Sequence, residues 1–212
     1  MKHILWVLIF SLYSMIFAQG ELTAYQIVDR AQEAIKVKGV QGISVMQIID
    51  QKGRKRVRKI KQVTRLYDNG DTEKRLLRFM APADVKGVGL LTYDYKDKDD
   101  DLWIFMPALR KTRRIVSSEK AKNFMGSEFT YSDMTPPSLD DFTFNHLGEE
   151  KLNGVLCYKI EWIPKDEDIA EENGFSKRIT FLGKDDFVIR KSIYYDLDEE
   201  LLKELIIHEI KE

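Results

Sequence analysis

The sequence predicts a mainly β protein of the α+β class, in which an N-terminal helix precedes a long series of antiparallel strands. Two observations carry this prediction. Short segments rich in Val, Ile, Tyr, Phe and Trp recur along the chain, and turn dipeptides such as Asn69-Gly70, Asn153-Gly154 and Asn173-Gly174 separate them. Helical periodicity is scarce after residue 39, so most of the chain favours hairpins.

Residues 22–35 predict the helix, because their apolar side chains recur at three- and four-residue spacing and form one stripe. Thr23 is a suitable N-cap residue, and Gly39 closes the region. The residues of the stripe are Tyr25, Val28, Ala31 and Ile35.

The clearest strand is predicted at residues 155–163, where apolar and polar side chains alternate so that one face is buried and the other contacts water. Two hairpins are predicted elsewhere. One joins residues 175–182 to 187–195 through a short polar turn, and the other joins residues 89–95 to 102–106 through an acidic loop.

Two segments fit more than one structure. Residues 54–67 carry apolar side chains at every third position, which fits a basic helix, although the Asp68-Asn69-Gly70-Asp71 turn favours a hairpin strand. Residues 201–210 fit either a final strand or a C-terminal helix. Neither alternative changes the predicted fold class.

The first 18 residues predict a cleaved signal peptide, because a short basic start is followed by an apolar run that ends at the small residue Ala18. The alternative is a membrane anchor, which would need about 20 apolar residues. Ser11 and Ser14 interrupt this run. We therefore expect a periplasmic protein in which residues 19–212 form a single domain.

Composition narrows the function classes. The chain has 34 basic and 35 acidic residues, and the lack of a basic excess argues against nucleic acid as a partner. With 43% apolar residues, the chain can form a core without disulfides. Cys157, the single cysteine, lies in an apolar alternating run and is predicted to be a buried free thiol.

Motifs for catalysis and cofactor binding are absent. Neither phosphate-binding glycine motif occurs, no Gly-x-Ser-x-Gly elbow is present, and only His146 and His208 follow the signal peptide. The sequence therefore predicts no enzyme activity, no cofactor and no metal site. Five aspartates within residues 94–101 favour a solvated hairpin tip, and the alternative is a Ca²⁺ site that lacks the usual glycine.

Residues 54–61 form the strongest charge run, with six basic residues in eight. One interpretation is attraction to anionic lipid head groups or to an acidic partner. The other is a solvated strand face that protects a sheet edge from aggregation.

The most informative stretch is an aromatic strand that turns at Met106-Pro107 and returns with several guanidinium groups at residues 110–114. A glycine-interrupted aromatic loop follows at residues 124–133. Arginines beside an apolar mouth suit carboxylate or phosphate head groups while acyl chains lie inside. The alternative is that they pair with local acids such as Glu128 and Asp133.

Two motifs carry a resemblance to a known family: W-x-F-x-P-A-L-R-x-x-R-R-I at residues 103–115 and F-M-G-S-E-F-T-Y-S-D at residues 124–133. Pro82-Ala83-Asp84-Val85-Lys86-Gly87 supports them. Together they resemble the outer-membrane lipoprotein-sorting family, the LolA-like proteins often associated with RND-type exporters. The similarity extends over nearly the whole chain after the signal peptide.

The resemblance implies an open, incomplete antiparallel β-barrel of about ten or eleven strands, with an N-terminal helix and short loop helices covering an apolar cavity. It implies a monomeric, non-enzymatic periplasmic carrier of lipids or acylated lipoproteins, which contacts membranes transiently and exchanges cargo with an RND-type inner-membrane exporter. The ligand-binding residues expected on this basis are Trp103, Phe105, Met106, Arg110, Arg113, Arg114, Phe124, Met125, Phe129 and Tyr131.

Two other functions compete with the carrier. A periplasmic adaptor would dock on an exporter through the basic strand and residues 110–114 without carrying cargo. A secreted hydrolase would need a reactive centre, for which Ser127 and His146 are the available residues.

Overall fold

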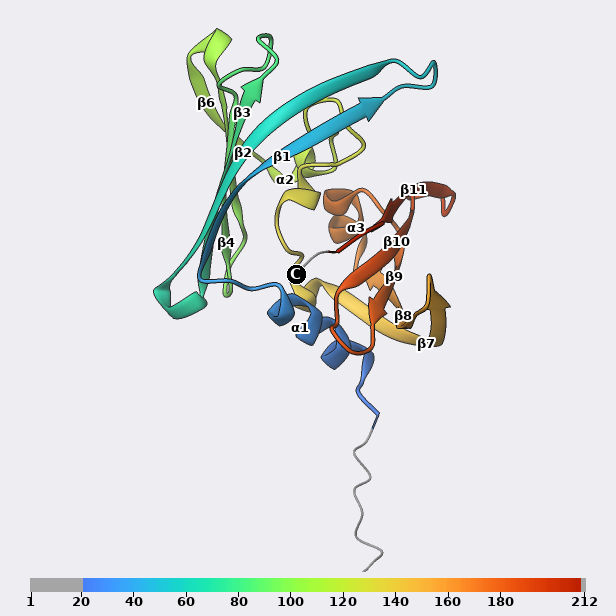
Figure 1. The fold of residues 1–212 in the computed structure, drawn as a ribbon. Coiled ribbons are helices and arrows are strands. Elements are labelled where there is room, and N and C mark those ends of the chain that lie inside the picture. Colours follow the sequence, from blue (N-terminus) through green and yellow to red (C-terminus); the bar gives the residue numbers. More distant parts are fainter. Residues whose placement is uncertain (1–20, 211–212) are drawn as a thin grey trace, which may run out of the picture.

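The computed structural model describes residues 21–210, and it confirms the predicted mainly β class. The strands form two antiparallel sheets that do not close into a barrel (Figure 1). The six-stranded sheet consists of β1 (Gly39–Ile49), β2 (Lys55–Tyr67), β3 (Thr72–Ala81), β4 (Gly89–Tyr95), β5 (Asp101–Met106) and β6 (Lys111–Ile115). The five-stranded sheet consists of β7 (Phe142–Leu152), β8 (Val155–Pro164), β9 (Lys177–Gly183), β10 (Ile189–Tyr195) and β11 (Leu201–Ile206).

Each sheet is a meander, in which every strand pairs with its neighbour in sequence. Short hairpin connections suffice for this order, which explains the frequent turn dipeptides. The predicted sheet is interrupted once, because residues 116–141 between β6 and β7 form only short helical turns and loops. The pattern of alternation along the chain predicts strands but does not show this division into two sheets.

Both ambiguous segments are strands. Residues 55–67 form β2, which pairs with β1 on one side and β3 on the other. Residues 201–206 form β11, which pairs with β10 at the edge of the second sheet. The helix-like spacing in β2 is therefore overridden by hydrogen bonding to two neighbouring strands.

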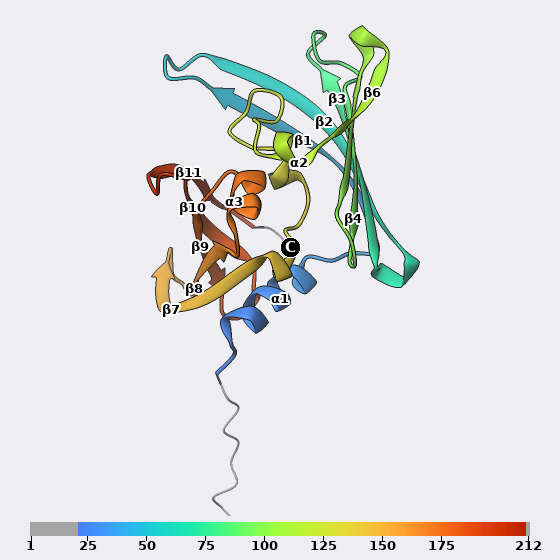
Figure 2. The ribbon, with the colours of Figure 1, turned by 180° about the vertical axis from the view of Figure 1, so that it is seen from behind.

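Three short α-helices accompany the sheets: α1 (Ala24–Ala34), α2 (Ser117–Lys120) and α3 (Glu167–Asn173). In both views α1 lies next to the five-stranded sheet, while α2 and α3 contact each other (Figures 1 and 2). Thr23 caps α1 as predicted, because its hydroxyl accepts from Gln26 N at 3.2 Å and the side-chain oxygen of Gln26 accepts from Thr23 N at 3.0 Å.

The buried face of α1 differs in part from the predicted stripe. Val28 is buried and Ala31 packs against the core of the five-stranded sheet, as the stripe predicts, whereas Tyr25 and Ile35 are exposed and Ala24 and Ile27 complete the buried face. The ring of Tyr25 contacts Phe144 of β7 edge-on at the margin of the sheet. The aliphatic side chains of α1, rather than the Tyr25 ring, therefore form the face that packs against the five-stranded sheet.

Each sheet has its own apolar core, and the face that carries it is called the inner face here. The first core combines strand residues with residues 82–88 and 124–131; its members are Ile60, Leu77, Phe79, Val85, Val88, Leu90, Leu102, Ile104, Ile115, Phe124 and Tyr131. The second core lies between the five-stranded sheet, α1 and the loops next to α3; its members are Ala24, Ile27, Val28, Leu139, Phe142, Ile160, Trp162, Phe175, Leu182 and Tyr194.

Cys157 is buried and unpaired, as predicted, and burial raises the pKa of its thiol. Within residues 21–210 no helix is long and apolar enough to cross a membrane. The predicted signal peptide lies outside the described residues.

Gly174 ends α3 in a left-handed conformation, with φ of 75°, and a Cβ atom there would lie 2.9 Å from the Cβ of Ala121. We expect Gly174→Ala to lower the free energy of unfolding by about 1–3 kcal/mol, because it combines backbone strain with a steric clash. Urea denaturation measures this change. Gly42→Ala is the matched control, since nothing lies within 4 Å of its Cβ position. Equal stability of the two variants would contradict the packing described here.

Candidate functional site

The inner face of the six-stranded sheet is rich in adaptable apolar side chains. Four partly buried methionines pack against the first core: Met46, Met106, Met125 and Met134. Methionine is unbranched and polarisable, so it adjusts to apolar partners of different shape. This face is therefore suited to contact with a flexible apolar ligand.

Residues 116–141, called the inter-sheet connection here, hold the loop 124–129 against this face. Arg56 of β2 donates from Nη2 to the Gly126 carbonyl oxygen at 3.2 Å. Arg75 of β3 donates from Nη1 to the Met134 carbonyl oxygen at 3.1 Å. Two guanidinium groups of the sheet thus bind the backbone of the connection.

The same connection is tied to the five-stranded sheet by an ion pair. Lys203 Nζ on β11 lies 2.6 Å from Asp133 Oδ2, and both side chains are largely buried. Asp133 Oδ2 also accepts hydrogen bonds from the backbone N and the hydroxyl of Thr130, at 2.8 and 3.0 Å. One carboxylate therefore fixes the turn of the connection and links it to the second sheet.

The structure separates the predicted ligand-binding residues into groups. Met106, Phe124, Met125 and Tyr131 contribute to the first core or pack against it. Trp103 and Phe105 lie on the opposite, outer face of β5, because they alternate with the buried residues Leu102 and Ile104. Phe129 is 41% exposed in the connection. The prediction placed all of these side chains together, whereas alternation along β5 separates them.

The predicted arginines are exposed. Arg113 Nη1 lies 2.5 Å from Glu119, and Arg114 Nη2 lies 2.6 Å from Asp101. Arg110 ends the turn between β5 and β6 in a left-handed conformation. Two of the three guanidinium groups therefore pair with local acids, although with different acids from Glu128 and Asp133.

Buried polar atoms without a partner point to a residue that the predicted site omits. Within residues 21–210 these atoms are Nε and Nη1 of Arg58, Nε1 of Trp162 and Nε of Arg178. All are N–H donors. Arg58 shares the inner face of β2 with Ile60, and Arg178 lies 3.6 Å from the centre of the Trp162 ring in the second core. The alternation Arg56, Arg58, Ile60 is the sequence signal that identifies the inward position of Arg58.

The outer face of the six-stranded sheet is both apolar and basic. One cross-strand row contains Val63, Leu76, Leu91, Trp103 and Arg114. Val63, Leu76 and Trp103 are each at least 37% exposed. Around this row, the strand cations of this face are Lys55, Lys59, Lys61, Arg65, Lys74 and Arg78. Exposed apolar side chains among unbalanced cations are typical of a surface that binds a partner.

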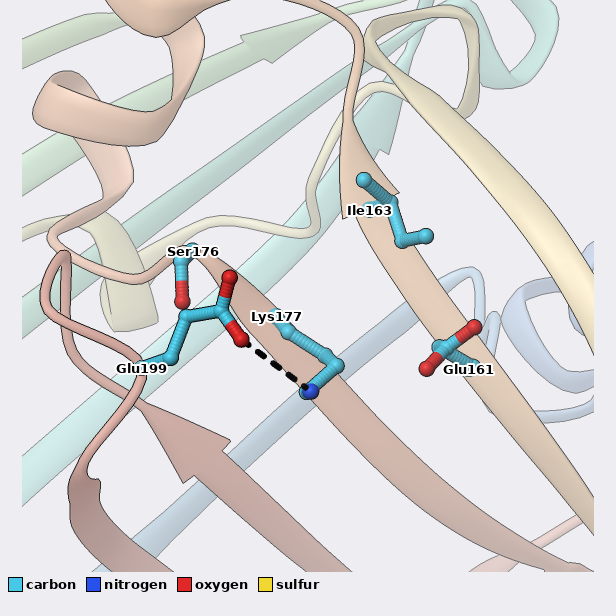
Figure 3. A pocket seen from close by; sticks show the side chains of 5 residues that line it. All are labelled: Glu161, Ile163, Ser176, Lys177 and Glu199. Carbon is cyan, nitrogen blue, oxygen red and sulfur yellow. Dashed lines mark ion pairs between the residues drawn. The ribbon is translucent and has the colours of Figure 1, made fainter.

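A small polar depression of about 200 Å³ lies on the five-stranded sheet (Figure 3). The residues that line it are Glu161, Ile163, Ser176, Lys177 and Glu199. Lys177 Nζ lies 4.0 Å from Glu199 Oε2 across it. It is an open, charged hollow away from both apolar cores, so it does not suit an apolar ligand.

The two residues considered for hydrolysis are engaged in different places. The Ser127 hydroxyl donates to the Phe124 carbonyl oxygen at 2.7 Å and accepts from Phe129 N at 3.2 Å. The His146 ring packs edge-on against Tyr158 in the five-stranded sheet. In the part of the chain that the structure describes, no three His, Cys, Asp or Glu side chains are arranged to hold a metal ion.

The acidic hairpin between β4 and β5 is only partly solvated. Burial, together with the nearby charges of Asp100 and Glu73, raises the pKa of Asp94 to about 7. Burial also raises the pKa of Asp100, whose carboxylate accepts from Tyr95 N at 3.3 Å. The side-chain interaction with Asp100 raises the pKa of Asp94 further.

Asp94 makes the stability of the protein depend on pH. Its pKa in the fold lies above the ordinary value of 3.8, so its protonated form is stabilised, and this contribution is lost as the pH rises through about 7. We expect Asp94→Asn to stabilise the protein at pH 8 by about 1–2 kcal/mol and to have little effect at pH 4. Thermal unfolding across this range measures the difference. Asp97→Asn at the exposed tip is the control, and a pH-independent gain for Asp94→Asn would contradict the argument.

Comparison with solved structures identifies the family. An outer membrane lipoprotein-sorting protein domain from Vibrio parahaemolyticus is 30% identical to this chain; the match covers 89% of this chain and 78% of that one, with a TM-score of 0.78. The chain belongs to the outer-membrane lipoprotein-sorting protein family. A family model described as "Uncharacterized protein" matches residues 71–212.

Two other structures share the fold of this family member. A DUF1329 family protein from Desulfovibrio piger is 28% identical, with a TM-score of 0.80, over 88% of this chain and 78% of that one. A LolA superfamily protein from Nitrosomonas europaea is 17% identical, with a TM-score of 0.66, over 90% of this chain and 80% of that one. No curated protein matches the sequence.

Both motifs that suggested the family fall within the region of the family model. The first motif, residues 103–115, forms β5, the turn after it and β6. The second, residues 124–133, forms the part of the inter-sheet connection that contacts Arg56 and Lys203. The second motif thus lies in the segment that joins the two sheets, and the first forms the two strands that precede this segment.

Proposed function

We propose that this lipoprotein-sorting family member is a periplasmic carrier that holds the acyl chains of a lipid or a lipoprotein against the inner faces of its two sheets. The observation that carries the proposal is the set of four methionines that pack against the apolar core on the inner face of the six-stranded sheet, two from its strands and two from the inter-sheet connection. Family membership and the open, two-sheet architecture support it.

The energetics favour such a carrier. Burial of an acyl chain contributes roughly 0.8 kcal/mol per methylene, so about ten buried methylenes contribute up to about 8 kcal/mol. This is enough to keep a chain out of water during passage between membranes. No bond has to form or break, and the carrier function needs neither a cofactor nor a catalytic residue.

The proposal assigns different roles to the residues that the motifs singled out. Met106, Phe124, Met125 and Tyr131 belong to the lining, because they lie on the inner side. Trp103 and Phe105 belong to a docking surface on the outer side. Exchange of cargo with an RND-type inner-membrane exporter is part of this proposal.

Neighbouring residues on opposite faces of β1 give a sharp test. We expect Met46→Trp to weaken uptake of a fluorescent fatty acid about tenfold, because the indole fills space equivalent to about two methylenes of the ligand. Fluorescence titration of the protein without its signal peptide measures the affinity. Native mass spectrometry of protein purified without detergent should also show a co-purified lipid.

Val45→Trp is the matched control, since Val45 is 62% exposed and its side chain lies on the outer face. It should bind the fatty acid as the wild type does. A wild-type protein that shows only its apo mass and takes up no fatty acid would refute the carrier function.

A second candidate function is that of a docking protein, and the outer face of the six-stranded sheet favours it. Trp103 and Leu76 are exposed there among lysines and arginines, whose long aliphatic stems extend the apolar surface. An anionic membrane surface complements this combination, because phospholipid head groups attract the cations while apolar side chains enter the interface.

Trp103 itself reports on docking, since Trp162 is buried and Trp6 belongs to the predicted signal peptide. Vesicles of phosphatidylglycerol should shift the Trp103 emission to shorter wavelength, and vesicles of phosphatidylcholine should not. Replacing Lys59 and Lys61 by Gln should weaken vesicle binding by about tenfold at low salt. Equal binding to both kinds of vesicle would exclude electrostatic docking. Vesicle binding by a wild type that takes up no lipid would favour the docking function over the carrier.

A further inference from the structure

We propose that Arg58 binds the phosphate of an acylated ligand, so that the cargo of this carrier is a phospholipid. The inference rests on the proposed carrier function and narrows it. It starts from one side chain on the inner face of β2 whose burial and lack of partners are unusual for an arginine.

Arg58 is only 7% exposed, and neither Nε nor Nη1 has a hydrogen-bond partner among the described residues. Its guanidinium lies 5.9 Å from the centre of the Phe79 ring, and Phe79 is completely buried. Met46 lies opposite on β1. The surroundings of the charge are therefore aromatic and aliphatic, with no carboxylate recorded against it.

A buried guanidinium in such surroundings is energetically unfavourable unless an anion compensates its charge. The contact with Phe79 offsets only part of this cost, since a cation over an aromatic ring gains far less than a paired charge. Phosphate suits the arginine fork, because two parallel N–H donors can bind two of its oxygens. Nε and Nη1 of Arg58 lack partners, and each forms one half of such a fork with Nη2, the third guanidinium nitrogen.

A second arginine and the loop 124–129 lie near Arg58. Arg56 lies two residues earlier on the same face, about 7 Å along the strand, and it holds the Gly126 carbonyl through Nη2. The loop 124–129 is thereby kept beside β2. Phe124 of this loop packs its ring 5.8 Å from that of Phe79. A phosphate at Arg58 would therefore lie next to the apolar core that receives acyl chains.

The remaining unpartnered atoms agree with this ligand class. Trp162 Nε1 and Arg178 Nε on the inner side of the second sheet are donors as well. A phospholipid offers only acceptors near its chains, namely phosphate and ester oxygens. The acylated cysteine of a lipoprotein has ester and amide groups but no phosphate at this position, so Arg58 favours the phospholipid.

The test compares ligands with identical acyl chains. The protein that comprises residues 19–212 is titrated separately with fluorescent phosphatidylglycerol, with diacylglycerol and with a diacylated cysteine lipopeptide. We expect phosphatidylglycerol to bind about tenfold more tightly than the two neutral ligands, and Arg58→Met to abolish this preference. Arg58→Lys should retain part of it. Lys151→Met at an exposed position of β7 in the other sheet should leave it unchanged.

Thermal unfolding of the ligand-free protein provides a second readout. If the charge of Arg58 is compensated only by a bound ligand, Arg58→Met removes an uncompensated buried charge from the ligand-free protein and should raise its melting temperature. A purely structural arginine would lower it on replacement.

The outcomes separate this inference from the carrier function. Equal binding of phosphatidylglycerol and diacylglycerol, unchanged by Arg58→Met, would overturn the phosphate site but leave the carrier intact. Failure of all three ligands to bind would instead refute the carrier. Millimolar inorganic phosphate should displace phosphatidylglycerol only weakly; full displacement would reassign Arg58 to free phosphate and overturn the assignment to a phospholipid.

Discussion

The ion pair between Asp133 and Lys203 is the interaction on which the arrangement of the two sheets depends. The sheets share no hydrogen-bonded strands, so their relative position is set by the inter-sheet connection. Asp133 closes the turn of this connection through Thr130 and attaches it to β11 through Lys203. Because both charges are largely buried, the pair specifies geometry more than it adds net stability.

Alternation along β2 places the cations of its basic run on both faces of the sheet. In β2, Arg56 and Arg58 lie on the inner face, whereas Lys59 and Lys61 lie outside. The outer cations are solvated and interact with water at little cost. Arg58 is removed from water without a partner, so its charge has a much stronger effect on what can bind nearby. A strand of period two thus places cations with different roles within a few residues.

Much of this architecture is predictable from the sequence, because turn dipeptides and alternation are local signals. The α1 cap at Thr23, the strand β8 and the hairpin between β9 and β10 follow from such signals. The site is less predictable. Trp103 and Phe105 share a motif with Met106, but the strand period places them on the opposite face. The division into two sheets depends on contacts between distant residues such as Asp133 and Lys203, which no local pattern specifies.

The buried charge also bears on how a carrier can release its cargo. When an acyl chain passes from the protein to a membrane, it moves between two apolar environments, so the large methylene contributions nearly cancel. The free-energy difference that remains between bound and released cargo comes from the contacts of the head group and from the state of the empty protein. Release leaves Arg58 without an anion inside an apolar core, which favours the loaded protein over the empty one. In the carrier that we propose, the guanidinium retains cargo in transit and selects by head group, while the proposed docking face determines where the exchange takes place.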